Sequence, residues 1–174
     1  MKRGFTLIEI MVAVSIFAIV AVITTGALVT ASEVNRKAQA IKIAMDNVSF
    51  AMDSMVFNLR EGGDFGCGTG SANLLDNCNG GDHLVFRSKR NNANDEIIRY
   101  RFEDSTGLGK IQIARGGVAD YTDITSTEVD IEDVRFYVPS SAGRKTKAVI
   151  VIKGQVPGKT TTEFNLQTTV KANY

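Results

Sequence analysis

The stretch "RGFTLIEIMVAVSIFAIVAVITTGALVTA" (Arg3–Ala31) decides the fold, because it is long and apolar enough to cross a membrane. Its last 22 residues, from Ile10 to Ala31, carry no charge. As a helix they would extend roughly 33 Å, compared with about 30 Å for the hydrocarbon core of a bilayer. The apolar region of a cleaved signal peptide is only about 7–15 residues long. The stretch therefore predicts a retained single-pass span.

The charges around this span predict its orientation. Lys2 and Arg3 precede it, so the positive-inside rule leaves the N-terminus in the cytoplasm and exports the remainder. The chain has 20 basic and 19 acidic residues. Without Lys2, Arg3 and Glu9, 18 basic and 18 acidic residues remain. This balance argues against a broad phosphate-binding surface. The basic clusters Arg87–Arg90 and Arg144–Lys147 are therefore interpreted as solubilising loop charge, with nucleic-acid binding the less favoured interpretation.

Glu9 is the one acid at the mouth of the span. A carboxylate in the apolar phase costs on the order of 2.5–3.5 kcal/mol at the centre of the membrane and less near the edge, which makes it a functional candidate. A cut between Gly4 and Phe5 would create an α-amine at the membrane surface. That amine could pair with Glu9 of a neighbouring subunit, which would relieve both desolvated charges and favour one assembly register.

The segment "KRGFTLIE" (Lys2–Glu9) resembles the processing site of type IV prepilins and of type II secretion pseudopilins. It has a short basic leader, Gly4 before the cut, Phe5 after it, and a glutamate at the fifth position of the mature chain. The resemblance implies that a prepilin peptidase cuts after Gly4 and N-methylates Phe5. It also implies that the apolar helix remains as membrane anchor and filament core, and that Glu9 acts in subunit recognition during assembly.

The same resemblance implies the partners and the location of the protein. The partners are other pilin or pseudopilin subunits in a hetero-oligomeric filament, the peptidase, the inner-membrane assembly platform and membrane lipid. The location is the inner membrane, with a periplasmic or extracellular C-terminal domain, and then the filament. Major pilins generally carry a proline near the position of Gly26. Because this proline is absent here, and because of the segment "VAVSIFAIVA" (Val12–Ala21), the chain resembles a minor pilin or minor pseudopilin more than a major subunit.

The helical pattern continues beyond the membrane over residues 32–61 with two apolar stripes. One stripe comprises Ala38, Ile41, Met45, Val48, Met52, Met55 and Leu59. The second stripe, Ile43, Phe50 and Phe57, lies almost opposite the first. Either both stripes are buried within one domain, or one packs on a sheet while the other faces neighbouring helices in a filament. The resemblance favours the filament, and the spacing leaves open which stripe faces the sheet.

Residues 62–82 are expected to form a glycine-rich loop. Seven of the 20 residues from Gly62 to Gly81 are glycine, and the segment holds both cysteines, Cys67 and Cys78. For an exported domain, these cysteines predict a disulfide; the alternatives are free thiols or a partial metal site. A chain with a single histidine argues against zinc. "DNCNGGD" (Asp76–Asp82) lacks the spacing of a calcium loop, so no metal or cofactor is predicted.

The remaining residues, 83–174, alternate as antiparallel strands do. Strands are expected at 83–88, 96–103, 110–114, 129–138, 147–156 and in a final segment where Phe164, Leu166, Thr168 and Val170 share a face. We also expect a bulge between Ile131 and Val134, and a strand at 147–156 covered on both faces. The fold class is therefore α+β, with a long N-terminal helix whose outer half packs on a sheet of about five or six strands.

The expected organisation is a leader at 1–4, a membrane helix at 5–31, an amphipathic continuation at 32–61, the loop at 62–82 and the sheet at 83–174. This order agrees with the pilin family. "DIEDVRFYV" followed by "VIVIKG" resembles the J-type minor pseudopilin or the W-type minor pilin.

No enzyme is predicted, because His83 is the only histidine and the chain has neither a phosphate-binding loop nor a dinucleotide fingerprint. Asp130, Glu132 and Asp133 are interpreted as acids on a strand surface rather than as catalytic carboxylates. The expected function is a minor pilin-like structural subunit acting in filament assembly or initiation. The alternatives are a minor pseudopilin of type II secretion and a DNA-uptake or adhesive tip pilin acting as a binding module.

Overall fold

The structure, a computed structural model, describes residues 4–67, 78–89, 96–105, 107–116, 120–139, 147–158 and 161–173. The chain forms two compact units, Met1–Ala40 and Ile41–Tyr174. Helix α1 (Leu7–Arg60) contains 54 residues that belong to both units. In the described part of the first unit it is the only helix or strand.

The first unit presents an apolar helix with satisfied polar groups. One 18-residue window of α1 has a mean hydropathy of 2.7, and none of that window is buried within the protein. Its length and composition are those of a helix that can cross a membrane. The hydroxyls of Ser15, Thr24, Thr25 and Thr30 each donate to a backbone carbonyl three or four residues earlier, at 2.8 to 3.1 Å. These polar groups therefore need no partner from a lipid environment.

The second unit contains nine strands among its described residues, in two antiparallel sheets. The first sheet has the order β1-β3-β4-β5-β6, and the second has the order β2-β7-β8-β9. The strand bounds are β1 (Gly62–Gly66), β2 (Cys78–Gly81), β3 (His83–Ser88), β4 (Glu96–Glu103), β5 (Lys110–Arg115), β6 (Thr122–Asp123), β7 (Asp130–Val138), β8 (Lys147–Val156) and β9 (Thr162–Lys171). The predicted α+β class is confirmed, although the strands form two sheets rather than one.

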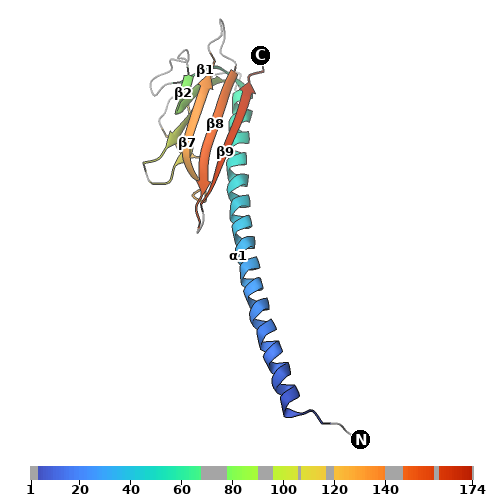
Figure 1. Cartoon of the computed structure of the whole chain (residues 1–174). Helices are drawn as coiled ribbons and strands as arrows, with labels where there is room; N and C mark the ends of the chain where they lie inside the picture. Colours follow the sequence, from blue (N-terminus) through green and yellow to red (C-terminus); the bar gives the residue numbers. More distant parts are fainter. Residues whose placement is uncertain are drawn as a thin grey trace. The chain divides into compact units, whose positions relative to one another are not determined.

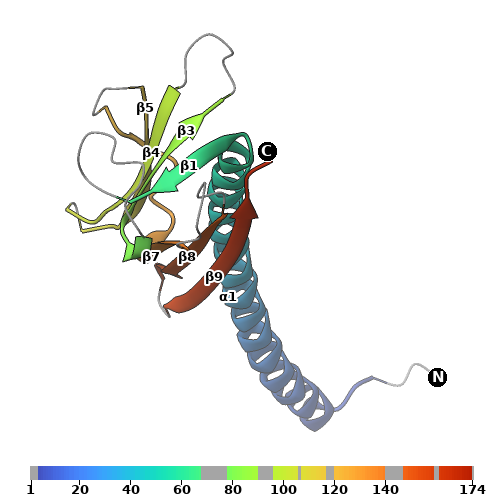
Figure 2. The ribbon, with the colours of Figure 1, turned by 90° about the horizontal axis from the view of Figure 1, so that it is seen from above.

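A single core joins the two sheets and the C-terminal part of α1. Figures 1 and 2 show β9 alongside this part of the helix, and Figure 2 shows β1 leading from the end of α1 into the first sheet. The helix contributes the buried residues Ala44, Val48, Met55 and Leu59, the first sheet Leu84, Phe86, Ile98 and Tyr100, and the second sheet Val134, Phe136, Ile150 and Ile152. The helix and both sheets therefore bury their apolar faces against one another in a common centre.

The strands of the second sheet agree closely with their sequence patterns. The register between β7 and β8 shifts between Ile131 and Asp133, which confirms the predicted bulge. Along β8, one face is buried, whereas Val149 and Val151 on the other face are only half-buried. The expectation that both faces of this strand are fully covered was therefore wrong for the outer face.

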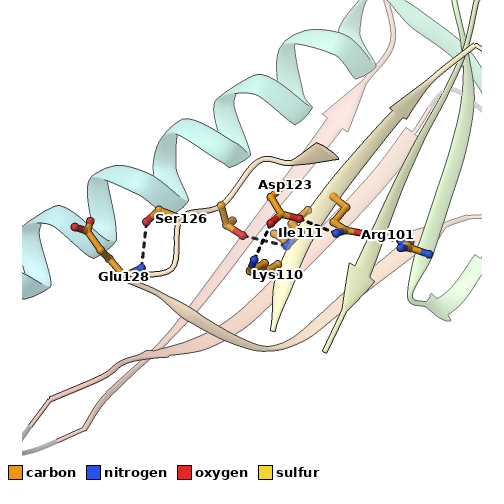
Figure 3. A network of polar contacts seen from close by, with 8 residues as sticks. Arg101, Lys110, Ile111, Asp123, Ser126 and Glu128 are labelled. Atoms are coloured by element: carbon orange, nitrogen blue, oxygen red, sulfur yellow. Dashed lines mark hydrogen bonds and ion pairs between the residues drawn. The ribbon is translucent and has the colours of Figure 1, made fainter. Parts of the chain in front are cut away.

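Strand β6 was not predicted, because it is only two residues long and both are exposed. Polar contacts hold it against β5 (Figure 3). The carboxylate of Asp123 accepts from Lys110 Nζ at 2.7 Å and from Gln112 Nε2 at 2.6 Å. Just beyond, Thr125 Oγ1 accepts from the Ile111 backbone N–H at 3.1 Å. Side-chain pairing rather than hydrophobic alternation therefore extends this edge of the sheet.

Two strands also lie within the segment 62–82 that was expected to be loop. Strand β1 pairs Gly62 with Ser88 of β3, and β2 pairs Cys78 with Val138 of β7. A Cβ atom on Gly62 would lie 2.5 Å from the ring of Phe86. Glycine is required there because the strand passes directly over a buried aromatic ring, so its presence does not mark a loop.

Candidate processing and assembly site

The predicted cleavage position lies in extended chain just before α1. Gly4 and Phe5 precede the helix, which begins at Leu7. A Cβ atom on Gly4 would meet nothing within 4 Å, and Phe5 is 81% exposed. A peptide bond in this position is open to a protease. Cleavage after Gly4 and methylation of Phe5 stay predictions.

Thr6 and Glu9 form a reciprocal cap at the start of α1. The hydroxyl oxygen of Thr6 accepts from the Glu9 backbone N–H at 3.4 Å. Glu9 Oε2 in turn accepts from the Thr6 backbone N–H at 3.3 Å and from the Thr6 hydroxyl at 3.2 Å. This arrangement is a capping box, in which the residue before the helix and the third residue within it satisfy each other's amides. The spacing T-x-x-E in "TLIE" was the sequence signal for this cap, and the sequence analysis missed it.

The cap gives Glu9 a local role as well as the predicted role in assembly. A carboxylate near a helix N-terminus is favoured by the helix dipole, typically by about 0.3–1 kcal/mol. Both hydrogen bonds from Thr6 to the acid use Oε2. Among the described residues, Oε1 accepts no hydrogen bond, so it is the oxygen that a cation from outside the chain would meet. Substitutions at Glu9 must therefore separate capping from charge.

The structure shows which stripe of α1 faces the sheets. Val48, Met55 and Leu59 of the first stripe are fully buried, together with Ala44 and Ala51, which the sequence analysis did not assign to it. The second stripe is exposed: Ile43 is 46%, Phe50 74% and Phe57 49% accessible. Burial of both stripes within one domain is therefore wrong for this chain. The exposed stripe stays a predicted filament contact.

Cys67 and Cys78 are joined in a disulfide, with their Cα atoms 5.2 Å apart. Cys67 directly follows β1 of the first sheet, and Cys78 begins β2 of the second sheet, so the bond connects the two sheets. A Cβ atom on Gly81 would lie 3.0 Å from Cys67 Sγ, so the glycine leaves room for the bond. Residues 68–77, which the disulfide closes into a loop, lie outside the described residues and include the start of the segment considered for calcium.

The other candidate chemical groups are held in surface contacts. His83 Nδ1 lies 2.8 Å from Asp82 Oδ1, and this hydrogen bond lowers the pKa of Asp82 below its usual range. Asp130 accepts from Gln155, and Asp133 pairs with Arg135. Within the described part of the chain, no group of three or more histidine, cysteine or acidic residues could hold a metal ion.

Only part of each basic cluster lies within the described residues. Arg87, Ser88 and Lys89 belong to the end of β3 and the residue after it, and Lys147 begins β8. Arg90 and residues 144–146 lie outside the described ranges.

Comparison with protein families matches the N-terminal segment of the chain. Residues 1–25 match the family described as the prokaryotic N-terminal methylation motif. No curated protein and no solved structure matches the chain. The matched segment contains Gly4, Phe5, the Thr6–Glu9 cap and most of the apolar stretch.

The apolar helix that begins within this motif fits a single-pass membrane anchor by its length and composition. The motif supports membership of the type IV pilin and pseudopilin family. A motif of this type implies processing by a prepilin peptidase and association with other pilin subunits. The family that carries the motif is structural rather than enzymatic.

Proposed function

We propose that the protein is a minor pilin-like subunit of a type IV pilus-type filament and that it acts in filament assembly or initiation. One observation carries this proposal: the methylation motif at residues 1–25 begins a helix that still exposes Ile43, Phe50 and Phe57 after its other face is buried. Apolar surface that a folded domain leaves exposed in this way often marks an interaction site. A neighbouring subunit helix is the partner that a filament supplies.

The helix start supports a role for Glu9 in this assembly. Cleavage after Gly4 leaves a cationic amine on Phe5, and Glu9 Oε1 is the carboxylate oxygen that accepts no hydrogen bond from a described residue. An amine from one subunit and a carboxylate from another would cancel each other's charge in the membrane. This contact favours one register between adjacent helices.

The first test is the intact mass and N-terminal sequence of the full-length protein from native membranes. A chain that begins at Phe5 and is about 14 Da heavier than the unmodified chain, the net mass of one methylation, supports processing and methylation. A chain that still begins at Met1 in cells with an active prepilin peptidase contradicts the proposal. A chain that begins beyond residue 31 contradicts it as well, because the anchor would have been lost.

A second measurement separates the proposed pilus function from its alternatives. The protein should appear in the sheared filament fraction, and deletion of its gene should reduce the number of filaments. Loss of protein secretion with unchanged surface filaments would identify a pseudopilin instead. Normal filaments with a loss of DNA uptake or of adhesion would identify a tip-binding module.

A further inference from the structure

We propose that the exposed stripe of α1 docks on a helix of a different membrane-anchored subunit, one that presents Lys or Arg side chains seven residues apart opposite Asp46 and Asp53. The same two acids keep a second copy of this chain from that position. The proposal rests on the proposed filament function and specifies which kind of subunit meets the stripe.

Two aspartates alternate with the apolar residues of the exposed stripe. Ile43, Asp46, Phe50, Asp53 and Phe57 follow one another at alternating spacings of three and four residues. All five are exposed. This spacing is the a and d pattern of a helix that packs on another helix, here with an apolar residue at each a position and an acid at each d position. The uncovered face of α1 therefore has the pattern of a helix contact that contains two carboxylates.

Asp53 lies between two exposed aromatic side chains. Phe50, three residues earlier, is 74% exposed, and Phe57, four residues later, is 49% exposed. The residues from Ser49 to Phe57 include no lysine or arginine. Asp53 forms no hydrogen bond or ion pair with a described residue. A cation from a partner helix would pair with this carboxylate and lie within reach of two aromatic rings, which also attract cations.

Asp46 repeats this arrangement one heptad earlier, between Ile43 and Phe50. Lys42 lies four residues before it, but no ion pair joins these two described side chains. Such a pair on a helix surface contributes only about 0.2–0.5 kcal/mol, so the carboxylate stays available to another cation. The two acids are seven residues apart, about 10 Å along the helix axis. A partner helix of the same repeat matches them with cations at the same spacing.

The two acids disfavour packing of this stripe on a second copy of the chain. Anchored copies share one orientation, because the same N-terminal charges orient each span, so their helices pack parallel. In register, Asp46 would face Asp46 of the other copy, and Asp53 would face Asp53. Like charges across a contact lower its stability and reject the wrong partner. Specificity for a different subunit follows from this repulsion.

Arg60 is the one cation that continues the pattern, three residues after Phe57. A displacement of one heptad would bring Arg60 of one copy to Asp53 of the other, but it would also bring Asp53 to Asp46. Two heptads of displacement, about 21 Å, would bring Arg60 to Asp46. Of the apolar residues, only Phe57 and Ile43 would then face each other. A different subunit with cations at matching positions avoids both losses.

Photocrosslinking of the full-length chain in native membranes tests the proposal. Replacement of Phe50 by p-benzoylphenylalanine keeps an aromatic ring and places a photoreactive group between the two acids. Mass spectrometry of the adduct identifies the peptide that was reached. We expect a helical segment of a different subunit with the same N-terminal motif, with Lys or Arg residues seven apart beside the crosslinked position. Capture of a protein without this pattern does not support the proposal.

Charge reversals in this background decide whether the acids select the partner. Asp46→Lys with Asp53→Lys should lower the yield of the adduct about tenfold, because cations would then face cations. Reversal of the two partner cations to acids should restore the yield with that variant. The matched control, Glu132→Lys with Glu163→Lys, makes the same change in net charge at exposed positions of β7 and β9 and should leave the adduct intact. All four side chains are exposed, so thermal unfolding should be nearly unchanged.

Any of four results would overturn the inference. They are an unchanged yield after reversal of both aspartates, an adduct between two copies of this chain, a partner peptide without cations at this spacing, and no adduct from protein that is present in sheared filaments. Each leaves the filament function standing if the protein is found in those filaments. Conversely, a charge-dependent adduct from protein that never enters filaments would support the docking while contradicting the proposed function.

Discussion

Asn58 of α1 donates its side-chain N–H to the hydroxyl oxygen of Tyr100 on β4 at 2.7 Å, and both residues are buried. This hydrogen bond connects the helix to the first sheet inside the core. Burial raises the pKa of Tyr100 to about 12 from its ordinary value of 10, and the hydrogen bond from Asn58 opposes that rise. The burial of Tyr100 therefore makes the stability of the domain sensitive to alkaline pH.

The first prediction concerns that pH dependence. Because the pKa of Tyr100 is higher in the folded than in the unfolded state, its contribution to stability is fully present below pH 10. It is lost as the pH rises from about 10 to about 12, by about 3 kcal/mol for a rise of this size in the pKa. Thermal unfolding of the full chain in detergent, followed by circular dichroism, measures this loss. In Tyr100→Phe the loss should be absent, so an identical alkaline decline in that variant contradicts the assignment.

The second prediction concerns the crossing between the sheets. The Ile131 backbone N–H donates to the Gly109 carbonyl oxygen at 3.0 Å, and a Cβ atom on Gly109 would overlap the Ile131 carbonyl. Gly109→Ala should therefore lower the free energy of unfolding by about 3 kcal/mol or more, because both backbones must move. The matched control is Gly107→Ala, which strains a positive φ of 80° without any contact and should cost about 1 kcal/mol. Equal losses in the two variants would show that the crossing is not tightly packed.

The third prediction concerns the disulfide. A loop of this size, closed by Cys67 and Cys78 with a sequence separation of 11, constrains the unfolded chain by about 3 kcal/mol. The double variant C67S/C78S should lower the melting temperature by several degrees, and a reducing agent should do the same to the wild type. The reducing agent should have no further effect on the variant. A further drop in the melting temperature of the variant would show that the reducing agent acts on something other than this disulfide.

The fourth prediction separates assembly from folding on α1. Phe50 is 74% exposed, so Phe50→Ser should leave the melting temperature within about 1 °C of the wild type. We expect that variant to be lost from the sheared filament fraction. The control Met55→Ser changes a fully buried residue on the opposite face, and it should destabilise the domain by about 3 kcal/mol or more. Normal incorporation of Phe50→Ser would exclude the stripe as a subunit contact.

The fifth prediction divides the two roles of Glu9. Glu9→Gln keeps an acceptor for the Thr6 amide but loses the charge, whereas Thr6→Ala removes the hydroxyl's half of the cap and keeps the charge. If the acid pairs with the amine of a neighbouring subunit, Glu9→Gln should fail to enter filaments. Thr6→Ala should enter them, with a helix start weakened by about 1 kcal/mol. The opposite ranking in the filament fraction would make capping the main role.

The long helix and most strands could be predicted because their patterns are strong and local. The 22 uncharged residues that end at Ala31 and the alternation through Phe164, Leu166 and Val170 each give a single interpretation. The bulge between Ile131 and Asp133 was also predictable, since one misplaced apolar residue shifts the alternation. In the two strands, the alternation of residue types along the chain agrees with the alternation of burial.

The division into two sheets could not be predicted, because it depends on contacts between residues distant in sequence. Gly109 passes Ile131 at a distance that only glycine allows, and no local pattern identifies its partner. Gly62 misled the prediction for the same reason: its closeness to the Phe86 ring is a tertiary contact. The cap of Thr6 and Glu9 differs, because its hydrogen bonds span only three residues and its spacing alone was enough to predict it.

The position of that cap has a consequence for maturation. Thr6 and Glu9 both lie on the C-terminal side of the expected cut, so every group that closes the helix start survives removal of the first four residues. The peptidase would therefore meet a substrate whose helix start is already in its final conformation, and no refolding need follow the cut. The leader can then be recognised and removed by the peptidase without any change in the conformation of the start of α1.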